Sequence, residues 1–180
     1  AIGWLYEGVN CIRERDLTSV QHIYNMLEQH PGRAFRDAAT EAGKATMFLI
    51  RVTHSSGMLE GKYTPETKFP PGDHRSHRPR SWLLNGVKKV EQLRFLENAE
   101  RTLGQAALQW LLADDRVAST LPNIYNEEQL VEFAKAPDTA ALTSDEMAKV
   151  DELHSDNFGI EEEPPKFKGT MELSQETAAV

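Results

Sequence analysis

A short polar run, Thr53 to Gly57, carries the residues best suited to chemistry in this chain. It reads Thr-His-Ser-Ser-Gly and directly follows Met47–Val52, six residues that are apolar or β-branched except for Arg51. Ser hydroxyls and free backbone N–H groups can donate to an anion, and small residues let the backbone approach it closely. The pattern fits a parallel strand, buried on both faces, that opens into a ligand-facing loop. An ordinary strand with a polar turn fits equally well, because Ser-Ser-Gly is common in loops.

Two other sets of reactive side chains give weaker signals. His74 and His77 lie three residues apart in the basic segment HRSHRPR, a spacing that could hold a metal ion. The Pro-rich surroundings deny them a helix, and no Cys or acidic partner follows at ligand spacing, so we expect a solvated basic loop and no metal site. A basic loop near a phosphate is an intermediate alternative. Cys11 lies beside Ile12 on a predicted helix, where we expect a packed small residue and not a nucleophile.

Composition limits the class of protein. The 180 residues are 39% hydrophobic and 27% charged, as expected for a soluble domain that buries a core. The net charge of −8 and the lack of aromatic residues among the basic ones disfavour a nucleic-acid binder. There is no apolar run near the ~20 residues that span a membrane and no signal-peptide pattern. A single cysteine favours a reducing, cytoplasmic location. The chain begins inside a helical pattern, which is typical of a piece of a longer polypeptide.

The order of predicted elements is helix, strand, helix, strand, with short joints, which indicates parallel β/α units. The expected helices span 3–15 and 33–42, the second closed by Gly43, and the expected strands span 19–26, 45–52 and 117–121. A long irregular insert, Thr64–Arg80, precedes a helix over 81–98 with Ser81 at its N-cap. Three further N-caps are expected at Thr102 with Gln105, at Asn126, and at Thr143 with Glu146.

Three stretches of this sequence resemble one known family: VQHIYNMLEQ, RVTHSSGMLEGKYT with FPPGDHR after it, and AALQWLLADDRVASTLPNIYNEEQL. Over residues 3–155 they are similar to the last third or half of an aldo/keto reductase. The resemblance implies a fold of the α/β class, a partial (β/α)8 TIM barrel with about three parallel strands and flanking helices. We expect residues 1–159 to form this part, equivalent to strands six to eight, and residues 160–180 to be an extended or disordered tail.

The resemblance also implies a nicotinamide dinucleotide across the carboxyl ends of the strands. Gln21 stands where the family uses a glutamine to hold the nicotinamide carboxamide, which an amide can do as donor and acceptor. Arg51 stands where many members stack an aromatic ring on the nicotinamide, and a guanidinium can also stack. The loop expected to wrap the pyrophosphate contributes His54, Ser55, Ser56, Gly57 and Leu59.

At the adenosine end the resemblance assigns Asn123, Tyr125 and Gln129 to the cofactor site. Tyr125 occupies the position of an arginine that pairs with the 2′-phosphate of NADPH in the family. Glu127 and Glu128 lie at the same helix N-terminus, where carboxylates suit the helix dipole but repel a phosphate. NADPH is therefore the cofactor expected from the family, with NADH, weak binding, or use of a basic loop residue such as Arg75 as the alternatives.

The family's catalytic Asp, Tyr, Lys and His lie in the first half of the barrel, and none of those motifs occurs here. The primary hypothesis is therefore the cofactor-binding part of an NAD(P)H-dependent carbonyl reductase that is inactive alone. A small carbonyl substrate is expected only if the N-terminal half is present. The alternative hypothesis is a non-catalytic half-barrel module for interaction or nucleotide binding. Because three parallel strands leave two open edges, self-association is a further possibility.

Overall fold

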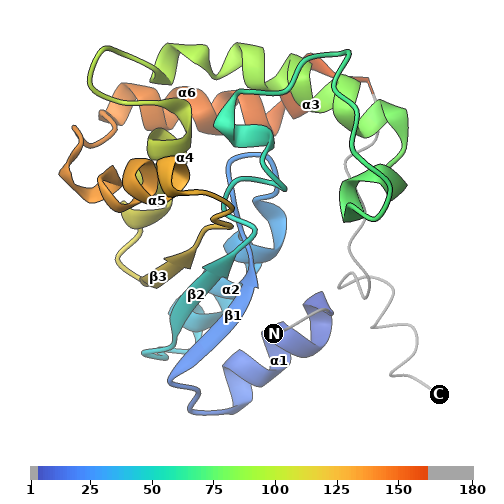
Figure 1. The fold of residues 1–180 in the computed structure, drawn as a ribbon. Helices are drawn as coiled ribbons and strands as arrows, with labels where there is room; N and C mark the ends of the chain where they lie inside the picture. Colours follow the sequence, from blue (N-terminus) through green and yellow to red (C-terminus); the bar gives the residue numbers. More distant parts are fainter. Residues whose placement is uncertain (1–3, 162–180) are drawn as a thin grey trace.

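Three parallel strands form the centre of the molecule, which the computed structural model describes for residues 4–161 (Figure 1). The strands β1 (Ser19–Ile23), β2 (Met47–Arg51) and β3 (Val117–Leu121) lie in the order β1-β2-β3. β1 and β2 pair in continuous register, whereas the β2–β3 pairing shifts between Phe48 and Leu49. Within the described residues the sheet does not close, so the predicted partial barrel with three parallel strands is confirmed.

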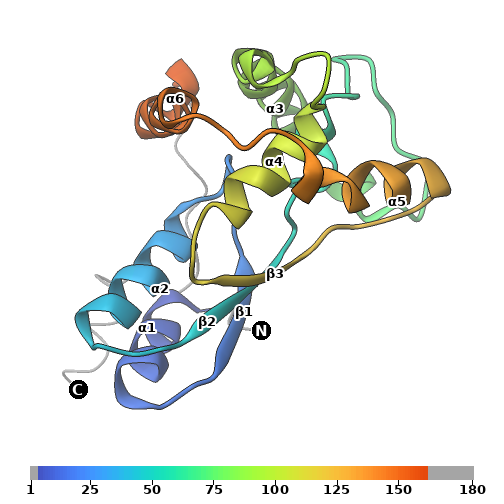
Figure 2. The same ribbon diagram turned by 90° about the vertical axis from the view of Figure 1, so that its left-hand side faces the viewer.

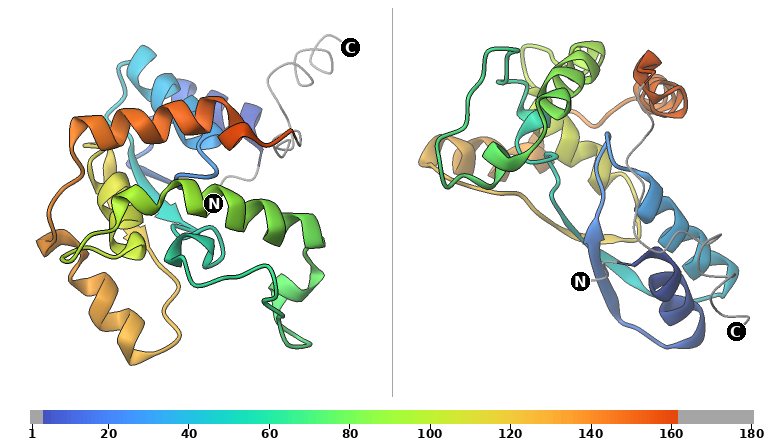
Figure 3. Two further views of the ribbon diagram at one scale, coloured as in Figure 1. Left: turned by 90° about the horizontal axis from the view of Figure 1, so that it is seen from above. Right: turned by 90° about the vertical axis from the view of Figure 1, so that its right-hand side faces the viewer.

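Helices connect the strands and cover one side of the sheet (Figure 2). The α-helices are α1 (Leu5–Glu14), α2 (His30–Glu41), α3 (Arg80–Gln92), α4 (Leu103–Leu112), α5 (Glu127–Ala134) and α6 (Ser144–Ser155). Short 3-10 turns occur at Met58–Glu60, His74–His77, Arg94–Leu96, Ala136–Asp138 and Asn157–Gly159. α3 and α6 lie near each other (Figure 3). Lys89 Nζ, 2.7 Å from Asn157 Oδ1, and Gln92 Nε2, 2.8 Å from the Phe158 carbonyl, join α3 to the turn after α6.

The two faces of the sheet differ in burial. Phe48 and Ile50 of β2 point toward the helices and are buried, whereas Met47, Leu49 and Arg51 alternate with them and are only partly buried. The expectation that this strand is buried on both faces was therefore wrong. An apolar run suits a strand inside a closed barrel, but here the second face of the sheet is uncovered by the described residues.

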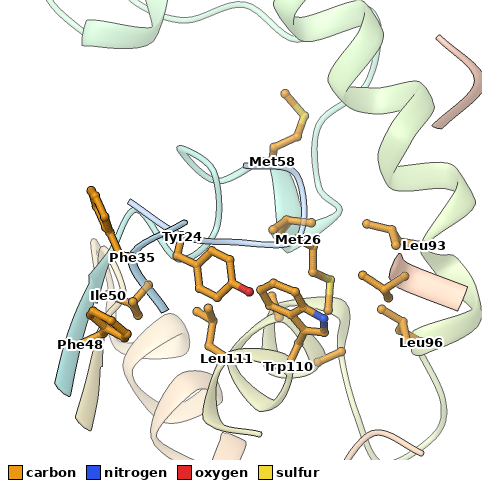
Figure 4. Packing of buried hydrophobic residues seen from close by; sticks show 14 of the residues in the cluster. Tyr24, Met26, Phe35, Phe48, Ile50, Met58, Leu93, Leu96, Trp110 and Leu111 are labelled. Carbon is orange, nitrogen blue, oxygen red and sulfur yellow. The ribbon is translucent and has the colours of Figure 1, made fainter. Parts of the chain in front are cut away.

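The hydrophobic core lies between the helix-side face of the sheet and α2 and α4 (Figure 4). His22 of β1 is buried between the rings of Phe35 and Phe48, with ring centroids 5.1 Å away in each case. Tyr24 and Trp110 pack against each other with centroids 5.0 Å apart. Burial lowers the pKa of His22 and raises that of Tyr24 to about 12, so both side chains remain neutral near pH 7.

The start of α2 corrects the sequence analysis. The helix was expected to begin at residue 33, but His30, Pro31 and Gly32 form its first turn. Proline is tolerated there because the first-turn N–H groups have no partner within the helix. A Cβ at residue 32 would lie 2.3 Å from the Tyr24 ring, so Gly32 is what lets the helix pack against β1. The predicted helix end is confirmed, with Gly43 at φ +62°.

The predicted helix over 81–98 was wrong at both ends. The observed helix starts at Arg80 with Pro79 as N-cap and no side-chain cap bond, so Ser81 is not the cap. It stops at Gln92, where Leu93 and Leu96 turn into the core and Arg94 donates to the Gly61 carbonyl. These contacts are long-range, and the sequence between 92 and 98 contains no helix breaker that would reveal them.

Two smaller expectations were also wrong. Cys11 was expected to be packed, but it is exposed on α1. His74 and His77 were expected to be non-helical, but they lie in a single 3-10 turn whose N-cap is Asp73. Among residues 4–161 no group of three metal-ligating side chains occurs.

The remaining caps agree with the sequence. Thr102 and Gln105 form a capping box at α4, Thr143 and Glu146 form one at α6, and Asn126 accepts from the Gln129 N–H at α5. The predicted tail over 160–180 lies outside the described residues from 162 onward. No described helix is long and apolar enough to cross a membrane.

Candidate functional site at the carboxyl ends of the strands

Because the strands are parallel, three loops meet at one edge of the sheet. They are 24–28 after β1, 52–57 after β2 and 122–126 after β3. In sheets of this kind the carboxyl-terminal edge carries the ligand site. We call this region the strand-end edge.

The loop after β2 has an unusual backbone. Val52, Ser55 and Ser56 have φ of +58°, +46° and +58°, and Gly57 follows at +88°. Each non-glycine residue in this left-handed region costs about 1 kcal/mol or more, and such strain clusters at ligand sites. The backbone N–H groups of Ser56 and Gly57 have no acceptor among the described residues. Two adjacent free N–H groups in a left-handed loop form an anion-binding concavity.

Hydrogen bonds from the β1 loop hold this strained loop in place. Asn25 is fully buried, and its Nδ2 lies 2.9 Å from the Val52 carbonyl and 2.8 Å from Glu28 Oε2. Ser55 Oγ donates to the same carboxylate oxygen at 3.0 Å. The sequence analysis missed Asn25 and Glu28, whose only local signal is an Asn in a turn after a strand. The partners lie 27 residues apart, so spacing could not reveal them.

His54 is enclosed and serves the fold. Its ring stacks on Phe133 with centroids 4.4 Å apart, and Nε2 lies 3.0 Å from the Gly104 carbonyl, so Nε2 carries the proton. Nδ1 faces the Thr53 hydroxyl at 3.3 Å. Burial lowers the pKa of His54, although the carbonyl contact opposes this. The side chain therefore fastens the loop to α4 and α5, and only its backbone is placed to meet a ligand. Leu59 is also fully buried.

Gln21 and Arg51 lie on the uncovered face of the sheet. The register pairs Gln21 with Leu49, and Arg51 with Ile23 and Leu121, so both polar side chains share one face. Arg51 is partly buried, yet its Nε has no hydrogen-bond partner and no described carboxylate pairs with its guanidinium. An unpaired, half-buried cation loses hydration without compensation. It is therefore ready to accept an anionic or polar ligand at the strand-end edge.

The loop after β3 is divided between exposed and buried residues. Asn123 and Tyr125 are exposed, with Tyr125 at 63%, but Gln129 is buried. Gln129 Oε1 accepts from the Tyr125 N–H at 2.8 Å, and its Nε2 donates to Glu60 Oε2 at 2.9 Å. Its amide therefore joins the loops after β2 and β3.

Arg75 approaches the Tyr125 ring, with its guanidinium carbon 5.8 Å from the centroid. The guanidinium also lies 4.8 Å from the Phe69 ring and makes bonds to both carboxylate oxygens of Asp73 and to the Tyr63 hydroxyl. The bond from Arg75 holds the pKa of Asp73 far below its ordinary value. The charge of Arg75 is thus already paired within the insert.

Three parallel β/α units in an unclosed sheet define part of a parallel β/α barrel, and the loops at one edge of this sheet carry unpaired donors. The chain belongs to the aldo/keto reductase family, whose sequence profile matches residues 4–155. The family consists of oxidoreductases that depend on nicotinamide dinucleotides.

Individual relatives agree with this assignment. L-glyceraldehyde 3-phosphate reductase from Escherichia coli (strain K12) is 32% identical over 112 residues, which cover 57% of this chain and 32% of the relative. The aldo-keto reductase AKR11C1 from Bacillus halodurans matches with a TM-score of 0.59 at 20% identity, over 83% of this chain and 47% of that structure. The glycerol dehydrogenase AKR11B4 from Gluconobacter oxydans matches with a TM-score of 0.65 at 19% identity, over 85% and 47%. The chain thus spans about a third of the curated relative and about half of the solved structures.

Proposed function

We propose that residues 1–159 are the C-terminal, cofactor-binding part of an NAD(P)H-dependent carbonyl or alcohol oxidoreductase of the cytoplasm. The observation that carries the proposal is the set of unpaired donors at the strand-end edge. These are the free N–H groups of Ser56 and Gly57 and the guanidinium of Arg51.

The donors suggest how the dinucleotide would lie. Its pyrophosphate would accept hydrogen bonds from Ser56 and Gly57, because both N–H groups lie in a left-handed turn and have no acceptor among the described residues. Gln21 and Arg51 would hold the nicotinamide end over the open face of the sheet, and the adenosine end would extend toward Asn123 and Tyr125. Ser55 and Gln129 would act indirectly, since their side chains are committed to Glu28 and Glu60. The buried side chains of His54 and Leu59 would hold the loop in its conformation.

The charges near Tyr125 bear on the choice between NADPH and NADH. Glu127 and Glu128 start α5, and Glu60 lies beneath Gln129. Arg75, whose guanidinium approaches the Tyr125 ring, is neutralised by Asp73, and Lys62 is paired with Glu60 and Glu132. A 2′-phosphate would meet carboxylates without an unpaired cation to offset them, so the affinity for NADH is expected to match or exceed that for NADPH.

Catalysis would need groups from outside this sequence. A bound reduced nicotinamide supplies a hydride, and the carbonyl oxygen then needs a proton donor, worth about 10²–10⁴-fold in rate. No motif of this chain matches the Asp, Tyr, Lys and His of the family, so we infer that the chain alone binds the cofactor without turnover. Further β/α units packed on the open face and on the edges of β1 and β3 would bring the proton donor and complete the pocket for a small carbonyl substrate.

An NMR titration of the chain with NADH and NADPH tests the proposal. The amide resonances of Ser56 and Gly57 should shift together with saturating affinity, and inorganic pyrophosphate should shift the same pair more weakly. Arg51→Met serves as the affinity-reducing variant, and Lys44→Met, on the opposite edge of the sheet, serves as its control. Binding that leaves both amides unmoved would place the phosphates elsewhere.

A second candidate is a half-barrel module that binds a nucleotide or a protein without catalysis. Tyr125 in place of an arginine and Phe133 in place of the family's usual Asn favour it. The two candidates diverge when β/α units carrying the family's proton donor are supplied from a relative's first half. Restored reduction of a carbonyl supports the enzyme, whereas cofactor binding without turnover in a folded complex supports the module.

A further inference from the structure

The helical side of the molecule contains a cavity of about 310 Å³. It lies between α2, the end of α4 and α6, and Tyr24 lines it from the loop after β1. A volume at the lower end of the range for ligand pockets suits one small molecule. None of the residues assigned to the dinucleotide lines this cavity, so a ligand bound there would be independent of the cofactor.

Tyr24 brings a buried hydroxyl to this cavity. The residue is 9% exposed, and its hydroxyl has no hydrogen-bond partner in the described part of the chain. Burial raises the pKa of Tyr24 to about 12, and the charges that modify this pKa are those of Arg33, Asp114, Arg36 and Asp151. All four of these residues line the cavity, so the hydroxyl faces it. A buried phenol without a partner is ready to exchange a hydrogen bond with a ligand.

The charged side chains of the cavity leave one carboxylate unpaired. Arg33 Nη2 lies 2.7 Å from Asp151 Oδ1, and Arg36 Nε lies 3.5 Å from Asp114 Oδ2. Asp37, the third carboxylate in the lining, has no hydrogen-bond or ion-pair partner among the residues that the structure describes. With two guanidinium groups against three carboxylates, the lining carries a net charge of −1. The cavity therefore favours a cation over an anion.

The end of α4 adds to this preference. Trp110 and Ala113 line the cavity from the last turn of the helix and its C-cap, and no basic residue lies in that turn. The carbonyl groups at a helix C-terminus carry a partial negative charge, which stabilises a nearby cation. Trp110 packs against Tyr24 (Figure 4), and Met147 of α6 also lines the cavity. These side chains suit the hydrocarbon part of a ligand.

This combination matches an organic ammonium ion. Its N–H groups can donate both to a carboxylate and to a phenol oxygen. A small anion would be repelled by Asp37, and a purely apolar ligand would leave the Tyr24 hydroxyl unpaired. A metal ion fits poorly, because residues 4–161 contain no group of three side chains that could hold one.

We propose that this cavity binds a small organic ammonium ion, with Asp37 and Tyr24 as its acceptors and Trp110 and Met147 as the packing surface for its hydrocarbon part. The site goes beyond the proposed function, since it shares no residue with the strand-end edge except Tyr24 and needs no dinucleotide.

The experiment is an NMR titration of the full chain that follows the indole N–H resonance of Trp110. Three ligands share one ring and differ in charge: 2-phenylethylammonium, 2-phenylethanol and 3-phenylpropionate. We expect a saturable shift with the ammonium ion, an affinity at least about tenfold lower for the alcohol, and no saturation with the carboxylate.

Two variants test the acceptors. Asp37→Asn should lower the affinity for 2-phenylethylammonium about tenfold, because it removes the charge that the ammonium group meets. Asp115→Asn is the matched control, since this exposed carboxylate follows Asp114 and does not line the cavity. Tyr24→Phe should lower the affinity about threefold or more. It should leave the thermal unfolding midpoint unchanged, because the hydroxyl has no partner to lose within the described residues.

Equal affinities for 2-phenylethylammonium and 2-phenylethanol would overturn the assignment, since the cavity would then not select a cation. An Asp37→Asn variant that binds the ammonium ion as tightly as the parent chain would also overturn it. The same conclusion holds if the Trp110 resonance shows no saturable shift up to about 10 mM ligand.

Discussion

Two arginines, one buried and one partly buried, differ in how their guanidinium groups are paired. Arg101, between α3 and α4, is 3% exposed, and each arm of its guanidinium has an acceptor: the carbonyls of Leu96 and Ala140 and the carboxylate of Glu146. Arg51, at the strand-end edge, has a buried Nε with no acceptor in the described residues. Arg101 is therefore fully paired within the described residues, whereas Arg51 keeps a donor without an acceptor there, and His22 Nε2 and Trp110 Nε1 in the core likewise have no partner.

The largest predicted effect concerns Arg101, whose guanidinium is fully paired. Arg101→Met should lower the free energy of unfolding by about 3–5 kcal/mol, because it leaves Glu146 and two carbonyls without their donor. Arg13→Met is the matched control: its partner Glu41 is exposed, so the loss should stay below about 1 kcal/mol. Urea unfolding followed by circular dichroism measures both. Equal losses in the two variants would mean that burial adds nothing to the contribution of the Arg101 contacts.

The second prediction concerns Arg51 at the strand-end edge. Arg51→Met should leave the free energy of unfolding unchanged or raise it, because the parent side chain has no partner to lose. The same change should weaken dinucleotide binding about tenfold or more, as expected for loss of a charge-assisted bond. Thermal unfolding with and without NADH reads both effects from one sample. A destabilised variant with full cofactor affinity would show that Arg51 is structural.

A smaller effect is expected in the dependence of the free energy of unfolding on pH, and it arises from His54. Because burial lowers its pKa in the folded chain, the unfolded chain binds more protons as pH falls through about 6.5. Stability is therefore full above that pH, decreases as the pH falls through about 6.5, and stops decreasing below the folded pKa. His54→Gln keeps an N–H for the Gly104 carbonyl and should flatten the dependence of the urea midpoint on pH. His22 and His154, whose pKa values burial also lowers, retain the remainder.

Local signals account for what the sequence could predict. The capping boxes at Thr102 and Thr143 lie within four residues, and the three strands are short β-branched runs between helical segments, so both are visible in a single window. The loop after β2 was found for the same reason, since its small residues are consecutive. Its membership in the cofactor site stays a prediction.

Contacts between residues far apart in the chain account for the features that could not be predicted from the sequence. The network that joins Asn25 and Glu28 to Ser55 spans 27 residues, and the helix at Arg80 begins where Pro79 orients the chain instead of at a polar cap. The exposure of the sheet face that carries Arg51 was not predicted. An apolar run indicates that a strand is buried, but it does not identify the residues that cover each of its faces. Half of a barrel leaves that face uncovered.

The smallest predicted effect compares Thr143, which caps α6, with Ser81, which was expected to cap a helix and does not. Thr143 Oγ accepts from the Glu146 N–H at 3.2 Å, and Glu146 Oε2 accepts from the Thr143 N–H at 2.7 Å. Thr143→Ala should therefore cost about 1 kcal/mol. Ser81 is exposed in the first turn of α3 and caps nothing, so Ser81→Ala should stay within about 0.5 kcal/mol. Because both changes remove a hydroxyl near a helix start, a difference between their urea midpoints isolates the capping bond. Equal midpoints would mean that α6 begins at Ser144 because of its packing, whatever residue precedes it.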